Sequence, residues 1–331
     1  MRVSKVDKRF RDLSRDGSLW QHELTLDYDD IEQKTNYCMG LVERCKKLVT
    51  LKILNKSENC ILPIITTMNV VIKAKDTLKC LDIDSSMRDW TPTAMSQLGQ
   101  MKNLTCLTMS FNSEALTVNW YAGAKILKDL AKLQKLEVLN LEISNRWILG
   151  EDSLTIMKSV FQDLKKLKNV KITLPASDYD ESLVTTLATN NPDLKGLRFM
   201  NYPSLSDESV DVLAKSCPGL QELNFRFRNG DRDINKLASS FPNLKQLFAM
   251  ASDRFDDEQS IELVQKFRKL EKLEFYIGSN ENVTDSGIER MVGAAKNLKY
   301  LRVFWANKVT RNLVERLRVE YPDLDLEIND Y

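Results

Sequence analysis

Apolar and polar positions alternate in short runs that recur along the chain at a nearly constant spacing. Each run follows the frame L-x-x-L-x-Φ, where Φ is apolar, and its second half alternates with the period of two that is typical of a half-buried strand. The first leucines of successive frames are 24 to 32 residues apart, and they are Leu48, Leu78, Leu104, Leu136, Leu167, Leu194, Leu220, Leu244, Leu270, Leu298 and Leu324. Self-similarity at such a period indicates an array of structural repeats.

Helical segments are predicted between these frames. In the stretch 209–216, Val210, Leu213 and Ala214 fall on one face of a helix. Proline disfavours helical geometry in the residue before it, so a helix should end at each of the pairs Asn191-Pro192, Cys217-Pro218, Phe241-Pro242 and Tyr321-Pro322. Polar residues at 206–209 and 284–287 should cap helix starts by accepting hydrogen bonds from the first free amides.

A strand, a turn and a helix that repeat in this way predict an α/β leucine-rich-repeat solenoid of horseshoe shape. Its parallel strands would line the concave face and its helices the convex face. Since one repeat cannot bury its own apolar face, we expect about eleven units over residues 29–331 to form one elongated domain, preceded by a distinct segment over residues 1–28.

Two repeats carry a more specific pattern. The segments 205–225 and 283–303 are similar to the approximate pattern I-T-D-x-G-L-x-x-L-x-x-x-C-P-x-L-x-x-L-x-L. This pattern resembles the cysteine-containing repeats of F-box/leucine-rich-repeat proteins, and the resemblance covers most of residues 45–328. The chain departs from the family where a cysteine is expected after the strand, because it has Tyr202, Gly278 or Ala306 there.

The N-terminal segment extends this resemblance. The stretch 6–26 is similar to the end of an F-box, V-x-K-R-(F/W)-x-x-L-(x)n-L-W-x-x-L, at Lys8, Arg9, Phe10, Leu13, Leu19, Trp20 and Leu24. The family's L-P-x-E helix and second apolar helix, which dock on a Skp-type adaptor, do not occur in the sequence. We therefore expect residues 1–331 to bind that adaptor weakly or not at all, unless a full F-box lies upstream. Alternatively, Leu13, Leu19 and Trp20 cap the open end of the repeat array.

The second half of the predicted concave face has the composition of a protein-binding surface. In the frame L1-x2-x3-L4-x5-Φ6-x7, positions x3, x5 and x7 should point away from the core. Position x7 is occupied in the later repeats by Met200, Arg226, Met250, Tyr276 and Phe304, and x5 adds Arg198, Phe248 and Arg302. Aromatic, methionine and arginine side chains are common in binding hot spots, although single exposed apolar residues are also normal. The arginines favour an acidic or phosphorylated segment in a protein partner.

The loops that follow the strands form a second candidate surface. Trp120, Tyr121 and Trp147 fall in the longest of these loops. They would either stand at an exposed rim or fold beneath the strands as part of the core.

Composition argues against catalysis. Lysine and arginine (48) nearly balance aspartate and glutamate (47), so no general nucleic-acid or membrane-surface binding is expected. A single histidine, six cysteines without a C-x-x-C pair, and no glycine-rich phosphate loop leave no support for an enzyme, a metal or a cofactor. Without a signal-peptide or membrane-spanning pattern, we expect a soluble protein of the cytoplasm or nucleus with reduced thiols.

The family resemblance implies a function. It suggests a non-catalytic substrate-recognition subunit of an SCF-type ubiquitin ligase, which holds a protein substrate on its concave face. The alternative is a stand-alone repeat scaffold or inhibitor without a role in ubiquitination.

Overall fold

The computed structural model describes eleven segments of the chain, and these group into two units, Met1–Asn191 and Pro192–Tyr331. The described residues are 22–54, 64–83, 91–111, 127–143, 151–173, 180–200, 205–227, 231–252, 255–277, 282–304 and 308–329.

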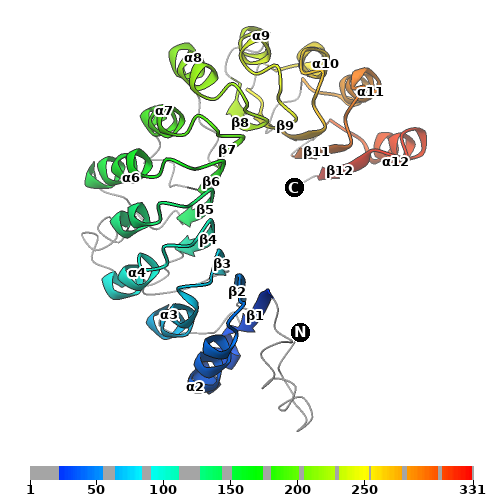
Figure 1. The fold of residues 1–331 in the computed structure, drawn as a ribbon. Helices are drawn as coiled ribbons and strands as arrows, with labels where there is room; N and C mark the ends of the chain where they lie inside the picture. The colour runs from blue at the N-terminus through cyan, green and yellow to red at the C-terminus, as the bar shows by residue number, and fades with distance from the viewer. Residues whose placement is uncertain are drawn as a thin grey trace. The chain divides into compact units, whose positions relative to one another are not determined.

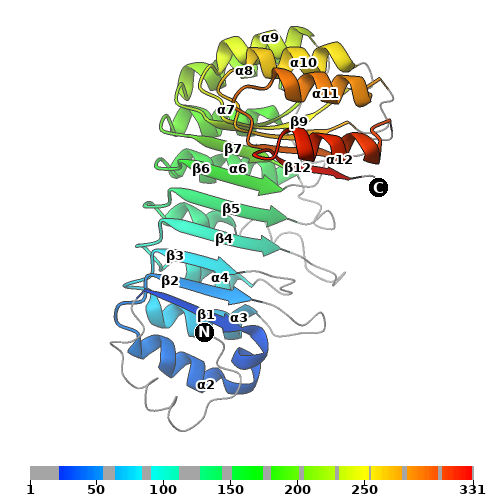
Figure 2. The same ribbon diagram turned by 90° about the vertical axis from the view of Figure 1, so that its right-hand side faces the viewer.

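Unit 1 is a layer of parallel strands covered on one side by helices (Figures 1 and 2). Each strand pairs with the next one in the chain. The strands are β1 (Glu23–Asp27), β2 (Thr50–Leu54), β3 (Cys80–Ile83), β4 (Cys106–Phe111), β5 (Val138–Ile143) and β6 (Asn169–Thr173). The helices are α2 (Tyr28–Arg44), α3 (Ile64–Val71), α4 (Pro92–Leu98), α6 (Glu151–Asp163) and α7 (Glu181–Asn190), with short 3₁₀ helices at Ile72–Ala74 and Lys128–Lys132.

Unit 2 has the same arrangement of parallel strands and helices, and its repeats are more regular (Figure 1). Its strands also pair in parallel and in chain order. They are β7 (Gly196–Phe199), β8 (Glu222–Arg226), β9 (Gln246–Met250), β10 (Lys272–Tyr276), β11 (Tyr300–Phe304) and β12 (Asp325–Asn329). The helices between them are α8 (Asp207–Ser216), α9 (Asp231–Ser240), α10 (Asp257–Lys266), α11 (Asp285–Ala294) and α12 (Arg311–Glu320).

The core of each unit lies between its strands and its helices. The first leucine of the frame is buried in every repeat from Leu48 to Leu270, whereas Leu298 and Leu324 are half-buried. The second leucine and the Φ residue point inward from the strand, as Leu51 and Ile53 do in β2. The predicted α/β leucine-rich-repeat fold is therefore confirmed, because stacking of neighbouring repeats buries what one repeat would expose.

Helix ends follow the sequence signals, with one exception. Helix α8 ends before Cys217, and the hydroxyl of Ser206 accepts a hydrogen bond from the amide of Ser209 at 3.2 Å. Thr284 precedes α11 as predicted, but it makes no side-chain capping bond to that helix. Its hydroxyl instead donates to the Asp257 carboxylate of the preceding repeat at 2.7 Å, so a link between repeats replaces the predicted cap.

In the N-terminal region, the structure describes the chain from His22, one residue before β1. This strand contains the Leu24-Thr25-Leu26 stretch, and it pairs with β2. Phe10, Leu13, Leu19 and Trp20 lie outside the described residues, so the choice between an F-box remnant and a cap stays a prediction, as does the boundary at residue 28. Within the described ranges, no helix is both long and apolar enough to cross a membrane.

Candidate functional site

Four of the predicted contact residues form a row across the strand face of unit 2, which is the face turned away from the helices. Arg226 is in register with Met250, Met250 with Tyr276, and Tyr276 with Phe304. Arg226 is exposed, and the other three side chains are half-buried. Adjacent strands are about 4.8 Å apart, so these four residues, the binding row, form one continuous strip.

The aromatic end of the binding row is held in a fixed arrangement. The rings of Tyr276 and Phe304 stack with centroids 4.1 Å apart and an angle of 10° between their planes. The Arg302 guanidinium carbon lies 4.4 Å from the centroid of the Phe304 ring. Stacking and the nearby cation restrict these side chains before any partner binds, which lowers the entropy cost of using them as anchors.

Met200 does not continue the row in the same way. It follows the last residue of β7, and the β7–β8 pairing ends at Leu197 and Leu223. Beyond that point the buried side chain of Asn224 replaces the strand partner. Its oxygen accepts a hydrogen bond from the Phe199 amide at 2.6 Å, and its nitrogen donates to the Phe199 carbonyl. No pattern in the sequence predicts this side chain between the strands. Met200 stays a proposed neighbour of the row.

Phe248 is not available to a partner, contrary to the expectation that x5 residues are accessible. Its side chain is only 1% exposed. The Arg198 guanidinium carbon lies 3.3 Å from the centroid of the Phe248 ring, and the Lys272 amino nitrogen lies 5.5 Å from it. Because Asn224 is turned toward β7, Arg198 reaches across β8 to this ring on β9. Arg198 can still contact a partner, whereas Phe248 supports it from beneath.

The same covering explains why strict alternation fails in β8, β9 and β10. Each of these strands has three successive buried residues. The extra buried residues are the x5 residues, with Asn224 at 2%, Phe248 at 1% and Glu274 at 8% exposure. Arg198 covers Phe248, Asn224 turns into the gap between β7 and β8, and Glu274 pairs with Lys272. The accessible part of this face is therefore narrower than the pleat alone predicts.

Charges on this face are largely paired with one another. Arg198 Nε lies 3.6 Å from Glu222, the Lys272 amino group lies 3.0 Å from Glu274, and Arg302 Nε lies 2.9 Å from Glu327. Arg226 has no ion pair with any residue in the described segments. Any preference for an acidic partner should therefore rest mainly on Arg226, since the other two guanidinium groups are partly neutralised.

Lys272 and Tyr300, at x3, were missed by the sequence reasoning. The Lys272 amino nitrogen lies 4.4 Å from the centroid of the Tyr300 ring. Burial, followed by the nearby carboxylates of Glu327 and Glu274, raises the pKa of the Tyr300 hydroxyl, so this group remains a neutral hydrogen-bonding group near pH 7. The sequence signal for this pair is an aromatic residue at x3 in the repeat that follows one with a lysine at x3.

The strand face of unit 1 has a different character. A cavity of about 270 Å³ is lined mainly by polar side chains, among them Asp82, Asn140, Glu142 and Lys171. The Asn140 amide donates to the Thr108 hydroxyl at 3.1 Å. The proposed rim residues Trp120, Tyr121 and Trp147 lie outside the described residues, so their exposure stays untested. In the part of the chain that is described, no group of histidine, cysteine and carboxylate side chains could hold a metal ion.

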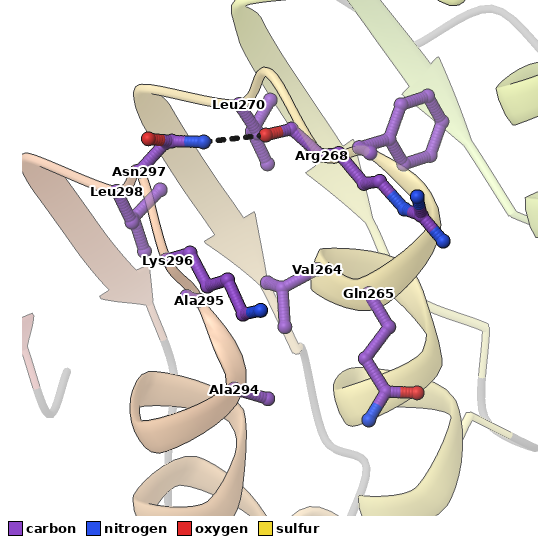
Figure 3. Close-up of a pocket in the computed structure, with 10 residues that line it drawn as sticks. Val264, Gln265, Arg268, Leu270, Ala294, Ala295, Lys296, Asn297 and Leu298 are labelled. Atoms are coloured by element: carbon purple, nitrogen blue, oxygen red, sulfur yellow. Dashed lines mark hydrogen bonds between the residues drawn. The ribbon is translucent and has the colours of Figure 1, made fainter.

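A larger cavity, of about 550 Å³, lies in unit 2 beside the N-terminal ends of the strands. It opens between the C-terminal ends of α10 and α11, and Val264, Leu270 and Leu298 contribute to its apolar wall (Figure 3). This cavity is on the opposite strand end from the binding row, because the row lies at the last residues of the strands.

Comparison with known proteins supports the fold and no closer relationship. No family model matches the chain. The structure of Rad7 in complex with Elc1 from yeast superposes with a TM-score of 0.64 at 18% sequence identity, covering 92% of this chain and 73% of that one. The leucine-rich-repeat protein LegL7 from Legionella pneumophila superposes with a TM-score of 0.47 at 15% identity, covering 76% of this chain and 83% of that one.

Proposed function

We propose that this chain is a protein-recruiting leucine-rich-repeat protein that binds its partner through the binding row of unit 2. The observation that carries the proposal is the continuity of the row. Arg226, Met250, Tyr276 and Phe304 occupy equivalent positions on four consecutive strands in register. Large apolar and cationic side chains grouped in this way supply anchors of the kind that dominate protein interfaces.

We further propose that the recruited protein is a substrate of an SCF-type ubiquitin ligase. The support is the resemblance of the repeats and of residues 6–26 to F-box/leucine-rich-repeat proteins. The similar fold of Rad7, which was solved in complex with another protein, Elc1, agrees with protein binding by this architecture. In this role the chain contributes proximity, because a bound substrate is held near a ligase whose chemistry resides in other subunits.

A stand-alone scaffold or inhibitor is the second candidate function. It would use the same binding row, and the two functions differ only in what is attached to the N-terminal region. Co-purification of a stoichiometric complex between residues 1–331 and a Skp-type adaptor would contradict our expectation of weak adaptor binding.

Affinity purification with quantitative mass spectrometry tests the binding row. Tyr276→Ala and Arg226→Ala should each weaken binding of the true partner by about 1–4 kcal/mol, the range found for interface anchors. Thr173→Ala is the matched control, since it removes a small side chain at the x7 position of unit 1. A partner should be lost with both unit 2 variants and retained with the control.

The ubiquitin-ligase role needs a second measurement on the partner so identified. Its ubiquitination and turnover in cells should depend on the chain and should respond to Tyr276→Ala. A partner that binds through the row but shows unchanged ubiquitination would favour the scaffold function. If no protein depends on Tyr276 or Arg226, the binding row has no such role and both candidate functions lose their support.

A further inference from the structure

The cavity between α10 and α11 lies at a position that most other repeats fill with a buried side chain. This position lies three residues before the first leucine of the frame, where the chain leaves its helix. It carries a buried side chain in eight repeats, namely Cys45, Met101, Leu133, Leu164, Asn191, Cys217, Phe241 and Phe267. In the repeat of β11 it is Ala295, which follows two phenylalanines in the series and is half-buried. The missing side-chain volume leaves a hollow beside Phe267.

The neighbouring leucine shows the consequence of this change. Leu270 is 3% exposed, as is usual at its position, whereas Leu298 is only half-buried. Both residues line the cavity together with Val264 and Ala294. The cavity of about 550 Å³ is lined by six apolar and four polar residues, and its volume lies within the range of about 300–1,000 Å³ that ligand pockets occupy. It could hold one large apolar side chain from another molecule.

A hydrogen bond links the two neighbouring turns that line the cavity. The Asn297 side chain donates to the Arg268 carbonyl at 2.7 Å (Figure 3). The same view shows the Lys296 side chain extending across the cavity toward Val264. Fixed turns on both sides mean that a partner would meet a largely formed site, which favours binding.

The surroundings of the cavity are positively charged. Arg268 and Lys296 line the cavity and are exposed, and neither forms an ion pair with a residue in the described segments. The acidic group on the same turns, Glu271, is already shared by Lys245 at 3.3 Å and Lys299 at 3.0 Å. Two cations without an ion pair beside the apolar side chains of the cavity are complementary to an apolar side chain flanked by carboxylates.

We propose that the α10–α11 cavity docks an acidic segment of a partner protein through one large apolar anchor residue. This surface is separate from the binding row and gives the chain a second contact at the other end of the strands. The apolar anchor would supply affinity by filling the volume that Ala295 leaves empty. The flanking carboxylates would select the segment through Arg268 and Lys296.

A synthetic peptide series tests this proposal on the full chain. The probe is a fluorescein-labelled nonapeptide of glutamate and serine with a central phenylalanine, followed by fluorescence anisotropy. It should bind saturably, and versions with a central alanine or with lysines in place of the glutamates should bind at least about tenfold more weakly. Raising the salt concentration should weaken binding, since Arg268 and Lys296 are exposed.

Two variants assign the binding to this cavity. Ala295→Phe, which restores the residue of the two preceding repeats, should reduce peptide affinity at least about tenfold while raising or preserving the melting temperature. Ala295→Leu provides a smaller filling residue if the phenylalanine disturbs folding. Lys296→Glu should also weaken binding, whereas Lys215→Glu, at the exposed end of α8, is the matched charge control and should not.

Any of three results would overturn the proposal. One is the absence of saturable binding of the phenylalanine peptide at concentrations up to about 1 mM. Another is unchanged affinity in folded Ala295→Phe or Ala295→Leu protein. Equal binding of the phenylalanine and alanine peptides would show a purely electrostatic contact and would likewise reject the anchor.

Discussion

Replacing Gly287 by alanine should destabilise the chain, and this effect should reverse in sign once Asp257 is removed. Gly287 lies in the first turn of α11, where a Cβ atom would overlap the Asp257 carboxylate of the preceding repeat. That carboxylate accepts hydrogen bonds from the amide and the hydroxyl of Thr284, both at 2.7 Å. The absence of a side chain at residue 287 thus makes room for the link between the two repeats.

The magnitude follows from the bonds that the extra methyl group would break. Hydrogen bonds to charged groups contribute about 1.5–3 kcal/mol each, and displacing the carboxylate should cost at least one of them. Alanine stabilises a helix by about 0.5–1 kcal/mol relative to glycine, which offsets part of this loss. Gly287→Ala should therefore lower the free energy of unfolding by about 1–2 kcal/mol. In an Asp257→Ala background it should raise that free energy by about 0.5–1 kcal/mol.

Urea denaturation followed by far-UV circular dichroism measures this double-mutant cycle. The coupling between residues 257 and 287 should amount to about 1.5–3 kcal/mol, which is within the range seen for residues in direct contact. Gly293→Ala is the control, because it lies in the same helix and its Cβ would meet only the Tyr321 hydroxyl at an ordinary contact distance. If Gly287→Ala is as stabilising as Gly293→Ala in the native background, the proposed packing is wrong.

Three further predictions follow from burial and from pKa shifts. Phe248→Ala should lower the free energy of unfolding by about 3–5 kcal/mol, as truncation of a buried aromatic does, and Tyr276→Ala by far less; the reverse order would contradict the assignment of Phe248 to the core. Burial, with a smaller effect of the neighbouring Cys80 thiol, raises the pKa of the Cys106 thiol to about 11. Iodoacetamide at pH 8 should therefore label Cys106 at least about 100-fold more slowly in the native chain than in urea, and equal rates would refute this. Hydrogen bonds from Ser182, assisted by Lys158, lower the pKa of Asp180, so its contribution to stability should be present above pH ~4 and lost on further acidification. Asp180→Ala should cost about 1 kcal/mol at pH 7 and almost nothing at pH ~2, as judged by thermal denaturation.

The repeat fold could be predicted because its main determinant is periodic in the sequence. The leucines of the frame recur at the spacing of one structural unit, and their burial follows from stacking of any repeat on its neighbours. The proline-marked helix ends were equally predictable, since proline restricts the residue before it. These features depend on local sequence alone.

The accessible surface was harder to predict because it depends on side chains from other repeats. Phe248 occupies a position that points outward, yet Arg198 from the strand beyond the neighbouring one covers it. The turn of Asn224 into the β7–β8 gap makes this possible, and no local pattern distinguishes that rotamer. The small size of Ala295, in contrast, could have been found by aligning the repeats and comparing the residue three positions before the first leucine.

The carboxamide of Asn224 also has a consequence for hydrogen exchange. In a regular sheet, the amide proton of a strand residue is protected by the main chain of the next strand, so it exchanges only when the strands separate. The amide proton of Phe199 is protected instead by one side chain, which can leave its position by rotating about χ1 while the strands stay paired at Leu197 and Leu223. Exchange at Phe199 should therefore follow the rotation of Asn224, whereas exchange at the amides in the core of β9 and β10 should follow unfolding of the repeats. This single amide would report on a local opening that leaves the sheet intact.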